Sequence, residues 1–125
     1  MINYDNRTFR SVSNSENGEV SNETVFEYQQ AGDLVSATYS GGDIEFGHFI
    51  GLVGEDGVID IRYHHLNMLG QLMTGICLST PEILDDGRIR LHEKWRWTSG
   101  DESEGLSVAE EISSHQRMNN FGSDW

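Results

Sequence analysis

The chain of 125 residues contains one cysteine, Cys77, and one proline, Pro81. A single cysteine cannot form an internal disulfide, and it excludes a metal site built from clustered cysteines. No apolar run approaches the roughly 18 residues that a membrane-spanning helix needs, so no transmembrane segment is predicted. Basic residues are also scarce, because 8 Lys and Arg stand against 21 Asp and Glu, and the formal net charge is −13.

This charge balance bears on the partners that the protein can bind. Nucleic acids and anionic membranes are held by basic faces, so we expect neither as a partner. The first five residues lack the basic and apolar regions of a signal peptide, which favours a cytoplasmic protein. The length corresponds to a single domain over residues 1–125. Nucleotide-binding glycine motifs are missing, and no cofactor is predicted.

What the sequence does contain is a series of short runs rich in β-branched and aromatic residues, separated by glycine, asparagine and aspartate. This punctuation predicts antiparallel strands joined by tight turns. The expected strands are 7–13, 24–30, 34–40, 44–53, 58–66, 71–80, 88–98 and 106–112. The last range also fits helical spacing, so a C-terminal helix remains an alternative. Residues 113–125 are largely polar and are expected to form a flexible tail.

The number of strands indicates how the sheet is arranged. Eight strands in an open sheet would leave two unpaired edges, whereas a closed sheet leaves none. The predicted fold is therefore all-β, a single-domain, antiparallel up-and-down β-barrel of about eight strands, which has room for one small ligand. A β-sandwich is the alternative. In shape such a barrel resembles lipocalins and other calycins, although the lipocalin Gly-x-Trp motif is absent from the N-terminal third.

The segment 88–98 gives the clearest indication of which residues face inward. Its residues alternate between an apolar face and a basic face. The apolar face, which should point into the barrel, consists of Ile89, Leu91, Glu93, Trp95 and Trp97. Glu93 is the exception among these residues, and a buried carboxylate must be hydrogen-bonded, paired or protonated.

Other segments should add residues to the interior. In 44–53 we expect His48 to face inward between Phe46 and Ile50, although this segment is apolar on both sides. The inner face of 58–66 should carry Ile59, Ile61, Tyr63 and His65. The inner face of 71–80 should carry Leu72, Thr74, Ile76 and Leu78. A bulge at Gly47, Gly51 or Gly75 would shift these registers by one residue and exchange the two faces.

An interior that is mostly apolar, with a few polar groups, is typical of a small-molecule site. The predicted ligand-binding residues are Phe46, His48, Ile61, Tyr63, His65, Leu91, Glu93, Trp95 and Trp97. One alternative is a barrel filled by its own side chains that acts through its surface, with no enclosed ligand. Another is an isomerase or cyclase in which a raised pKa makes Glu93 a general base, so the sequence leaves open whether the protein is an enzyme.

Two further hypotheses concern metal binding and assembly. His48, His65 and Glu93 have the donor types of a His₂-carboxylate site, but no spacing in the chain requires them to converge, and no metal is predicted. The segment 44–53 is apolar on both faces, which suggests that another surface covers its outer side. A homodimer is one way to provide that cover.

Four stretches carry a resemblance to a known family: residues 39–42 (YSGG), 61–64 (IRYH), 79–82 (STPE) and 90–101 (RLHEKWRWTSGD). Together they resemble a family of small bacterial proteins whose members often bear the label N-acetylglutamate synthase. The resemblance extends over roughly residues 3–112, and residues 90–101 are its most specific part. The label would imply an acetyltransferase, while the resemblance carries over no catalytic residues to this chain.

Overall fold

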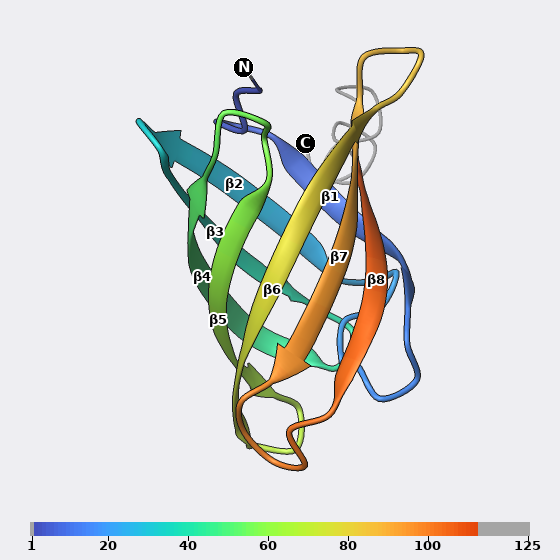
Figure 1. The fold of residues 1–125 in the computed structure, drawn as a ribbon. Helices are drawn as coiled ribbons and strands as arrows, with labels where there is room; N and C mark the ends of the chain where they lie inside the picture. The colour runs from blue at the N-terminus through green and yellow to red at the C-terminus, as the bar shows by residue number, and fades with distance from the viewer. Residues whose placement is uncertain (1, 113–125) are drawn as a thin grey trace, which may run out of the picture.

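The structure, a computed structural model that describes residues 2–112, is a closed barrel of eight antiparallel strands (Figure 1). The strands are β1 (Thr8–Asn14), β2 (Val25–Ala31), β3 (Leu34–Gly41), β4 (Ile44–Val53), β5 (Ile59–Asn67), β6 (Leu72–Ile83), β7 (Ile89–Trp97) and β8 (Glu104–Glu111). Each strand pairs with its sequence neighbours, and β1 pairs with β8 to close the sheet. The prediction of an up-and-down barrel is confirmed, and the segment that also fitted a helix is strand β8. The predicted tail, 113–125, lies outside the described residues.

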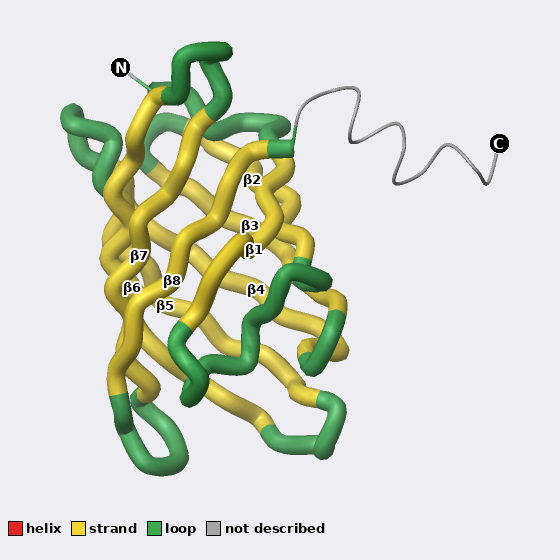
Figure 2. The backbone as a smooth tube through the Cα atoms, turned by 90° about the vertical axis from the view of Figure 1, so that its right-hand side faces the viewer, coloured by secondary structure: helices red, strands yellow, loops and turns green. Residues whose placement is uncertain are grey.

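Because the strands alternate in direction, the connections fall at two opposite ends of the barrel (Figure 2). One end carries the β1–β2 loop (residues 15–24) and the connections β3–β4, β5–β6 and β7–β8. The other end carries the connections β2–β3, β4–β5 and β6–β7, together with the segment that precedes β1. The β1–β2 loop is the longest of these connections, and it is the one that matters for the site described below.

The end that carries the N-terminal segment is plugged by aromatic side chains. Tyr4 lies across it, fully buried, and its hydroxyl donates a 2.6 Å hydrogen bond to the backbone carbonyl of Gly57. The rings of Phe9 and Tyr28 pack beneath Tyr4, with centroids 4.6 Å apart. Burying a large apolar side chain stabilises a fold by roughly 1.5–3 kcal/mol. This plug is therefore a substantial part of the core, and it closes the barrel at that end.

The inward faces of β5 and β7 are those predicted from the sequence. On β5, Ile61 and His65 are buried, and Tyr63 packs against the core. On β7 the alternation holds from Ile89 to Trp97, and Leu91 is fully buried. These strands carry large side chains on one face and charged side chains on the other, so the period-two pattern reports burial directly.

The predicted inward face of β4 is wrong. Phe46 is 57% exposed and lies on the outer surface with Ile50, while Phe49 points into the core. His48 also lies on the outer face, where its ring is 5.5 Å from the ring of His64 on β5. The inner face of β4 also includes Gly47, and the ring of Tyr39 on β3 fills the space that a side chain there would need.

The predicted inward face of β6 is wrong for the same reason. Leu72, Thr74, Ile76 and Leu78 lie on the outward-facing side of β6, and the exposed fraction of Leu72 is 80%. The interior side of β6 carries small residues, Gly75, Cys77 and Ser79. The ring of Tyr63 occupies the space that a side chain at position 75 would need. Hydrophobic pattern alone therefore selects the wrong face wherever the core is filled by rings from the neighbouring strand.

Candidate functional site

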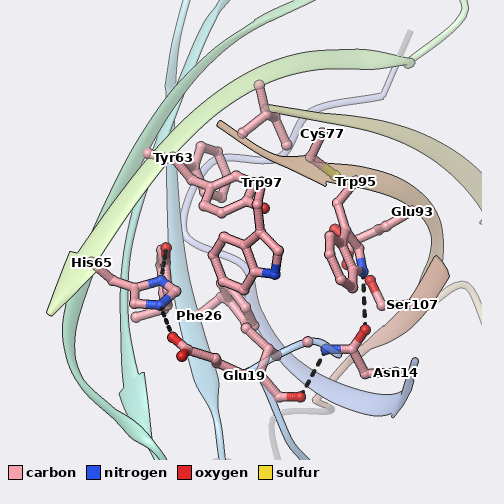
Figure 3. Close-up of a pocket in the computed structure, with 15 residues that line it drawn as sticks. Asn14, Glu19, Phe26, Tyr63, His65, Cys77, Glu93, Trp95, Trp97 and Ser107 are labelled. Carbon is pink, nitrogen blue, oxygen red and sulfur yellow. Dashed lines mark hydrogen bonds and ion pairs between the residues drawn. The ribbon is translucent and has the colours of Figure 1, made fainter. Parts of the chain in front are cut away.

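A cavity of about 60 Å³ lies inside the barrel, beneath the β1–β2 loop (Figure 3). All eight strands contribute to its lining, and the loop contributes Gly18, Glu19 and Val20. The walls are mainly aromatic: Phe26, Tyr39, Phe49, Tyr63, Trp95 and Trp97. The cavity has room for a few water molecules, but it is smaller than the roughly 300–1,000 Å³ of sites that hold drug-sized ligands.

Two carboxyl groups line this cavity, and Glu93, the one on the barrel wall, lies in a polar row that crosses three adjacent strands. Ser79 on β6 and Ser107 on β8 are its register partners on either side. The Ser107 hydroxyl donates to Glu93 Oε1 at 3.0 Å, and the Ser79 hydroxyl donates to Oε2 at 3.5 Å. Along β7, Glu93 lies four residues farther than Trp97 from the end that carries the β1–β2 loop. It is therefore deep in the barrel.

The surroundings of Glu93 favour its neutral form. Burial raises the pKa of Glu93 to about 7, and the hydrogen bonds from the hydroxyl groups of Ser107 and Ser79 only partly oppose that rise. Within residues 2–112, none of the ion pairs involves Glu93. The carboxyl group of Glu93 is thus close to half-protonated at neutral pH, inside a largely apolar enclosure and without a counter-charge from residues 2–112.

His65 connects the barrel wall to the β1–β2 loop. Tyr39 Oη lies 2.9 Å from His65 Nδ1, and His65 Nε2 lies 2.8 Å from Glu19 Oε1. Asn67 Nδ2 donates to the other Glu19 oxygen at 2.9 Å. Burial lowers the pKa of His65, although the hydrogen bond with Glu19 opposes this shift. The contacts fit a neutral imidazole whose Nδ1 accepts a hydrogen bond from the Tyr39 hydroxyl and whose Nε2–H donates to Glu19.

The two indoles of the cavity also hold the segment that covers it. Trp95 Nε1 donates to the side-chain oxygen of Asn14 at 2.9 Å, and Asn14 Nδ2 donates to the Val20 carbonyl at 2.9 Å. Trp97 Nε1 donates to the Asn17 carbonyl at 3.1 Å. The ring N–H groups of both tryptophans are therefore satisfied by Asn14 and the β1–β2 loop, which lies over the cavity as Figure 3 shows for Asn14 and Glu19.

Comparison with known families gives a result that agrees with this architecture. The family model for avidin-like proteins matches residues 2–112, which is the whole described barrel. The chain belongs to the avidin-like family. No curated protein matches this avidin-like chain.

Membership in the avidin-like family overturns the resemblance to proteins labelled N-acetylglutamate synthase. The fold gives a physical reason, because acetyl-CoA-dependent transferases bind pyrophosphate on the backbone N–H groups at a helix N-terminus. Residues 2–112 of this avidin-like barrel contain no helix. The quoted stretches form β-strands and the turns that follow them in this chain.

The avidin-like barrel brings together six of the nine residues predicted as ligand-binding. These are Ile61, Tyr63, His65, Glu93, Trp95 and Trp97. Leu91 is buried in the core and does not line the cavity. Phe46 and His48 lie outside the barrel wall for the reason given above.

Sequence reasoning missed the residues that β1, β3, β8 and the loop contribute, among them Asn14, Glu19, Tyr39 and Ser107. The length of the β1–β2 loop was the available signal, because connections longer than a tight turn often carry function. For Ser107, only the strand register could have revealed its place beside Glu93.

Within residues 2–112, no group of three or more His, Cys, Asp or Glu side chains lies where it could hold a metal ion. His48 and His65 lie on opposite sides of the barrel wall, so the His₂-carboxylate set does not converge. In the same range there is no helix with the length and apolarity needed to cross a membrane.

Proposed function

We propose that this avidin-like protein binds a small, partly apolar molecule inside its barrel, beneath the β1–β2 loop. The observation that carries the proposal is the cavity itself, which combines aromatic walls with a few polar groups, chiefly Glu93, His65 and Ser107. That combination is typical of small-molecule sites. Avidin-like barrels typically bind small ligands, and the family match supports the same function here.

The packing of the walls favours a binding barrel over one filled by its own side chains. Three rings pack closely against glycines of neighbouring strands, in the space that a Cβ would need: Tyr39 at Gly47, Tyr63 at Gly75 and Trp95 at Gly105. Rings that lie along the wall leave the barrel axis open, whereas rings that cross the axis would fill it. A protein that served only as a scaffold would gain stability by filling this space, since interiors are normally close-packed.

The size of the cavity implies that the β1–β2 loop moves when a ligand enters. Polar contacts hold the loop in place, through Glu19, Asn14 and Asn17, and Val20 is the apolar side chain of the loop that packs against the core. Segments with few buried apolar contacts are those that open at low free-energy cost. We therefore assign the β1–β2 loop as the entrance of the site.

Native mass spectrometry of freshly purified protein tests this proposal. A reproducible mass excess that disappears on denaturation would reveal a co-purified ligand. The matched variants are Cys77→Phe, which inserts a ring into the cavity, and Leu78→Phe, which places the same ring on the outer surface. We expect the mass excess in wild type and Leu78→Phe, and its loss in Cys77→Phe.

If the purified protein carries no ligand, the same three proteins are screened with a small-molecule library by thermal shift. A compound that stabilises wild type and Leu78→Phe but not Cys77→Phe supports the cavity as the binding site. Cys77→Met replaces Cys77→Phe if the larger ring prevents folding. The proposal fails if no compound shows this difference.

A second proposal concerns assembly. Four apolar side chains form an outer apolar patch on β3 and β4: Leu34, Phe46, Ile50 and Leu52, all more than two-fifths exposed. Leu34 and Leu52 are register partners, so the patch is continuous across the two strands. We propose that two copies of the chain associate through this patch, which agrees with the frequent oligomers of avidin-like proteins.

A further inference from the structure

The charges around the cavity have one sign. Among the residues that line it, the acidic ones are Glu19 and Glu93, and no lysine or arginine of residues 2–112 is present in the lining. His65 does not restore the balance, because burial holds its pKa low. The chain as a whole carries a formal net charge of −13. An anionic ligand would meet negative charge throughout its entry, whereas a cation would be attracted.

The hydrogen bonds of Glu93 leave acceptor positions on its carboxylate for such a cation. A carboxylate offers about four lone-pair positions, and within the described chain Glu93 uses them for only two hydroxyl donors. One of these contacts, with Ser79, is long at 3.5 Å. Glu93 therefore retains acceptor capacity toward the cavity that it lines. A charged donor there would supply the counter-charge that the barrel itself lacks.

The walls of the cavity suit the same class of ligand. Trp97 contacts Trp95 and Tyr63 in edge-to-face arrangements, with ring centroids 5.6 and 5.9 Å apart. Aromatic faces attract ammonium groups through their quadrupole, most strongly where water is excluded. Rings that meet edge to face leave parts of their faces open to the cavity. The same rings also provide an apolar surface for the hydrocarbon part of a ligand.

We infer that the ligand of this barrel is an organic ammonium ion, whose protonated amine donates to the Glu93 carboxylate and whose apolar body lies between Trp95, Trp97 and Tyr63. This inference rests on the proposed small-molecule function and adds the chemical class of the ligand. Glu93 is the residue that sets specificity, by requiring a cationic N–H donor at the deep end of the cavity. Glu19, near the entrance, adds a second attractive charge.

Three probes of similar size but different charge test the inference: benzylamine, benzyl alcohol and benzoate. Each is titrated into the protein at pH 8, where Glu93 is mostly ionised and benzylamine is still largely protonated. Binding is followed by calorimetry and by the indole N–H resonances of Trp95 and Trp97. We expect benzylamine to bind at least tenfold more tightly than benzyl alcohol, and benzoate to bind most weakly.

Two variants assign the preference to one residue. Glu93→Gln keeps a hydrogen-bonding side chain beside Ser79 and Ser107 but removes the charge. It should weaken the binding of benzylamine at least tenfold and the binding of benzyl alcohol much less. Glu45→Gln removes one carboxylate from an exposed position on β4 and should leave the binding of all three probes unchanged. Cys77→Phe should block all three if they occupy the cavity.

The outcomes separate this inference from the proposed function. If benzyl alcohol or benzoate binds as tightly as benzylamine, or if Glu45→Gln weakens benzylamine as much as Glu93→Gln does, the ammonium inference is overturned while the cavity remains a binding site. A co-purified ligand without a basic nitrogen would also overturn it. If no probe binds and the library screen finds no compound that Cys77→Phe blocks, the proposed function fails and the inference fails with it.

Discussion

Glu19 and His65 lie 46 positions apart in the sequence and are joined by a 2.8 Å hydrogen bond across the loop end of the barrel. Glu19 is on the β1–β2 loop and His65 is near the end of β5, so this contact attaches the loop to the wall. Asn67 holds the second oxygen of the same carboxylate. The side chain of Glu19 therefore fastens the part of the loop that lies over the cavity.

Glu19→Ala should release the loop. The variant loses a charge-assisted hydrogen bond and leaves His65 Nε2–H without its partner, so we expect a loss of about 1–3 kcal/mol in the free energy of unfolding. Amide hydrogen exchange of residues 15–22 should become faster. Glu16→Ala, an exposed change in the same loop, is the control. Equal exchange in the two variants would contradict the assignment of Glu19 as the fastening residue.

Glu93 should make the protein less stable as the pH rises from about 5 to 7. Its pKa is about 7 in the folded protein against an ordinary value of 4.5, so the folded state holds the proton over this range and the unfolded state releases it. The native state then binds more protons, and the free energy of unfolding falls by about 2 kcal/mol between pH 5 and pH 7. Four other groups interact electrostatically with Glu93, and their pKa values are raised, so they stay neutral there: Tyr28, Tyr39, Tyr63 and Cys77.

Glu93→Gln isolates this contribution. Glutamine cannot ionise, so the variant should match wild type near pH 5 and exceed it in stability at pH 8. Denaturant unfolding at a series of pH values measures the difference between the two proteins. A constant difference across the range would mean that Glu93 keeps an ordinary pKa in the folded state. A gain in stability combined with a loss of amine binding would identify Glu93 as a residue retained for function at a cost in stability.

Gly105→Ala should lower the free energy of unfolding although it adds only one methyl group. The indole of Trp95 lies where the new Cβ would be placed, so the ring must leave the wall. Overpacking of this kind typically costs about 1–3 kcal/mol. We expect a lower melting temperature and a shifted Trp95 indole resonance. Gly54→Ala, at an exposed turn where the nearest atom is the carboxylate tip of Asp56, serves as the control and should have a much smaller effect.

The outer apolar patch predicts a self-association that one charge should break. Ile50→Lys places an ammonium group at the centre of the patch and should convert a dimer into a monomer in sedimentation velocity. Leu69→Lys changes a side chain that is 82% exposed in the β5–β6 turn and should leave the assembly unchanged. If the wild-type protein sediments as a monomer at high concentration, the homodimer proposal is wrong.

The strands could be predicted from the sequence because the residues of the turns between them mark their boundaries. Glycine, asparagine and aspartate mark the turns, and seven glycines adopt the positive φ angles that such turns favour. The inward face could be predicted only where one face is large and apolar and the other charged, as on β7. On β4 and β6 the inward positions include Gly47 and Gly75, whose space is filled by Tyr39 and Tyr63 of adjacent strands. That relationship depends on register, which a single strand does not encode.

The same reasoning explains which part of the site was predictable. Glu93, Trp95 and Trp97 share one strand with a clear period, so their common face followed from the sequence. Glu19 reaches the site from a loop, and Ser107 reaches it through the pairing of β7 with β8. The contact of Glu19 with His65 needs the sheet to close into a barrel, and the contact of Ser107 with Glu93 needs the register of the β7–β8 pair.

The aromatic plug at Tyr4 bears on the rates at which a ligand would enter and leave the barrel. If a ligand binds in the cavity as we propose, the plug leaves the β1–β2 loop as its route of both entry and exit. A ligand that waits for the loop to open on the way in waits for the same opening on the way out. Residence time would then follow the opening frequency of the loop as well as the strength of contacts inside. A variant with a freer loop would exchange its ligand faster in both directions, even where its equilibrium affinity changes little.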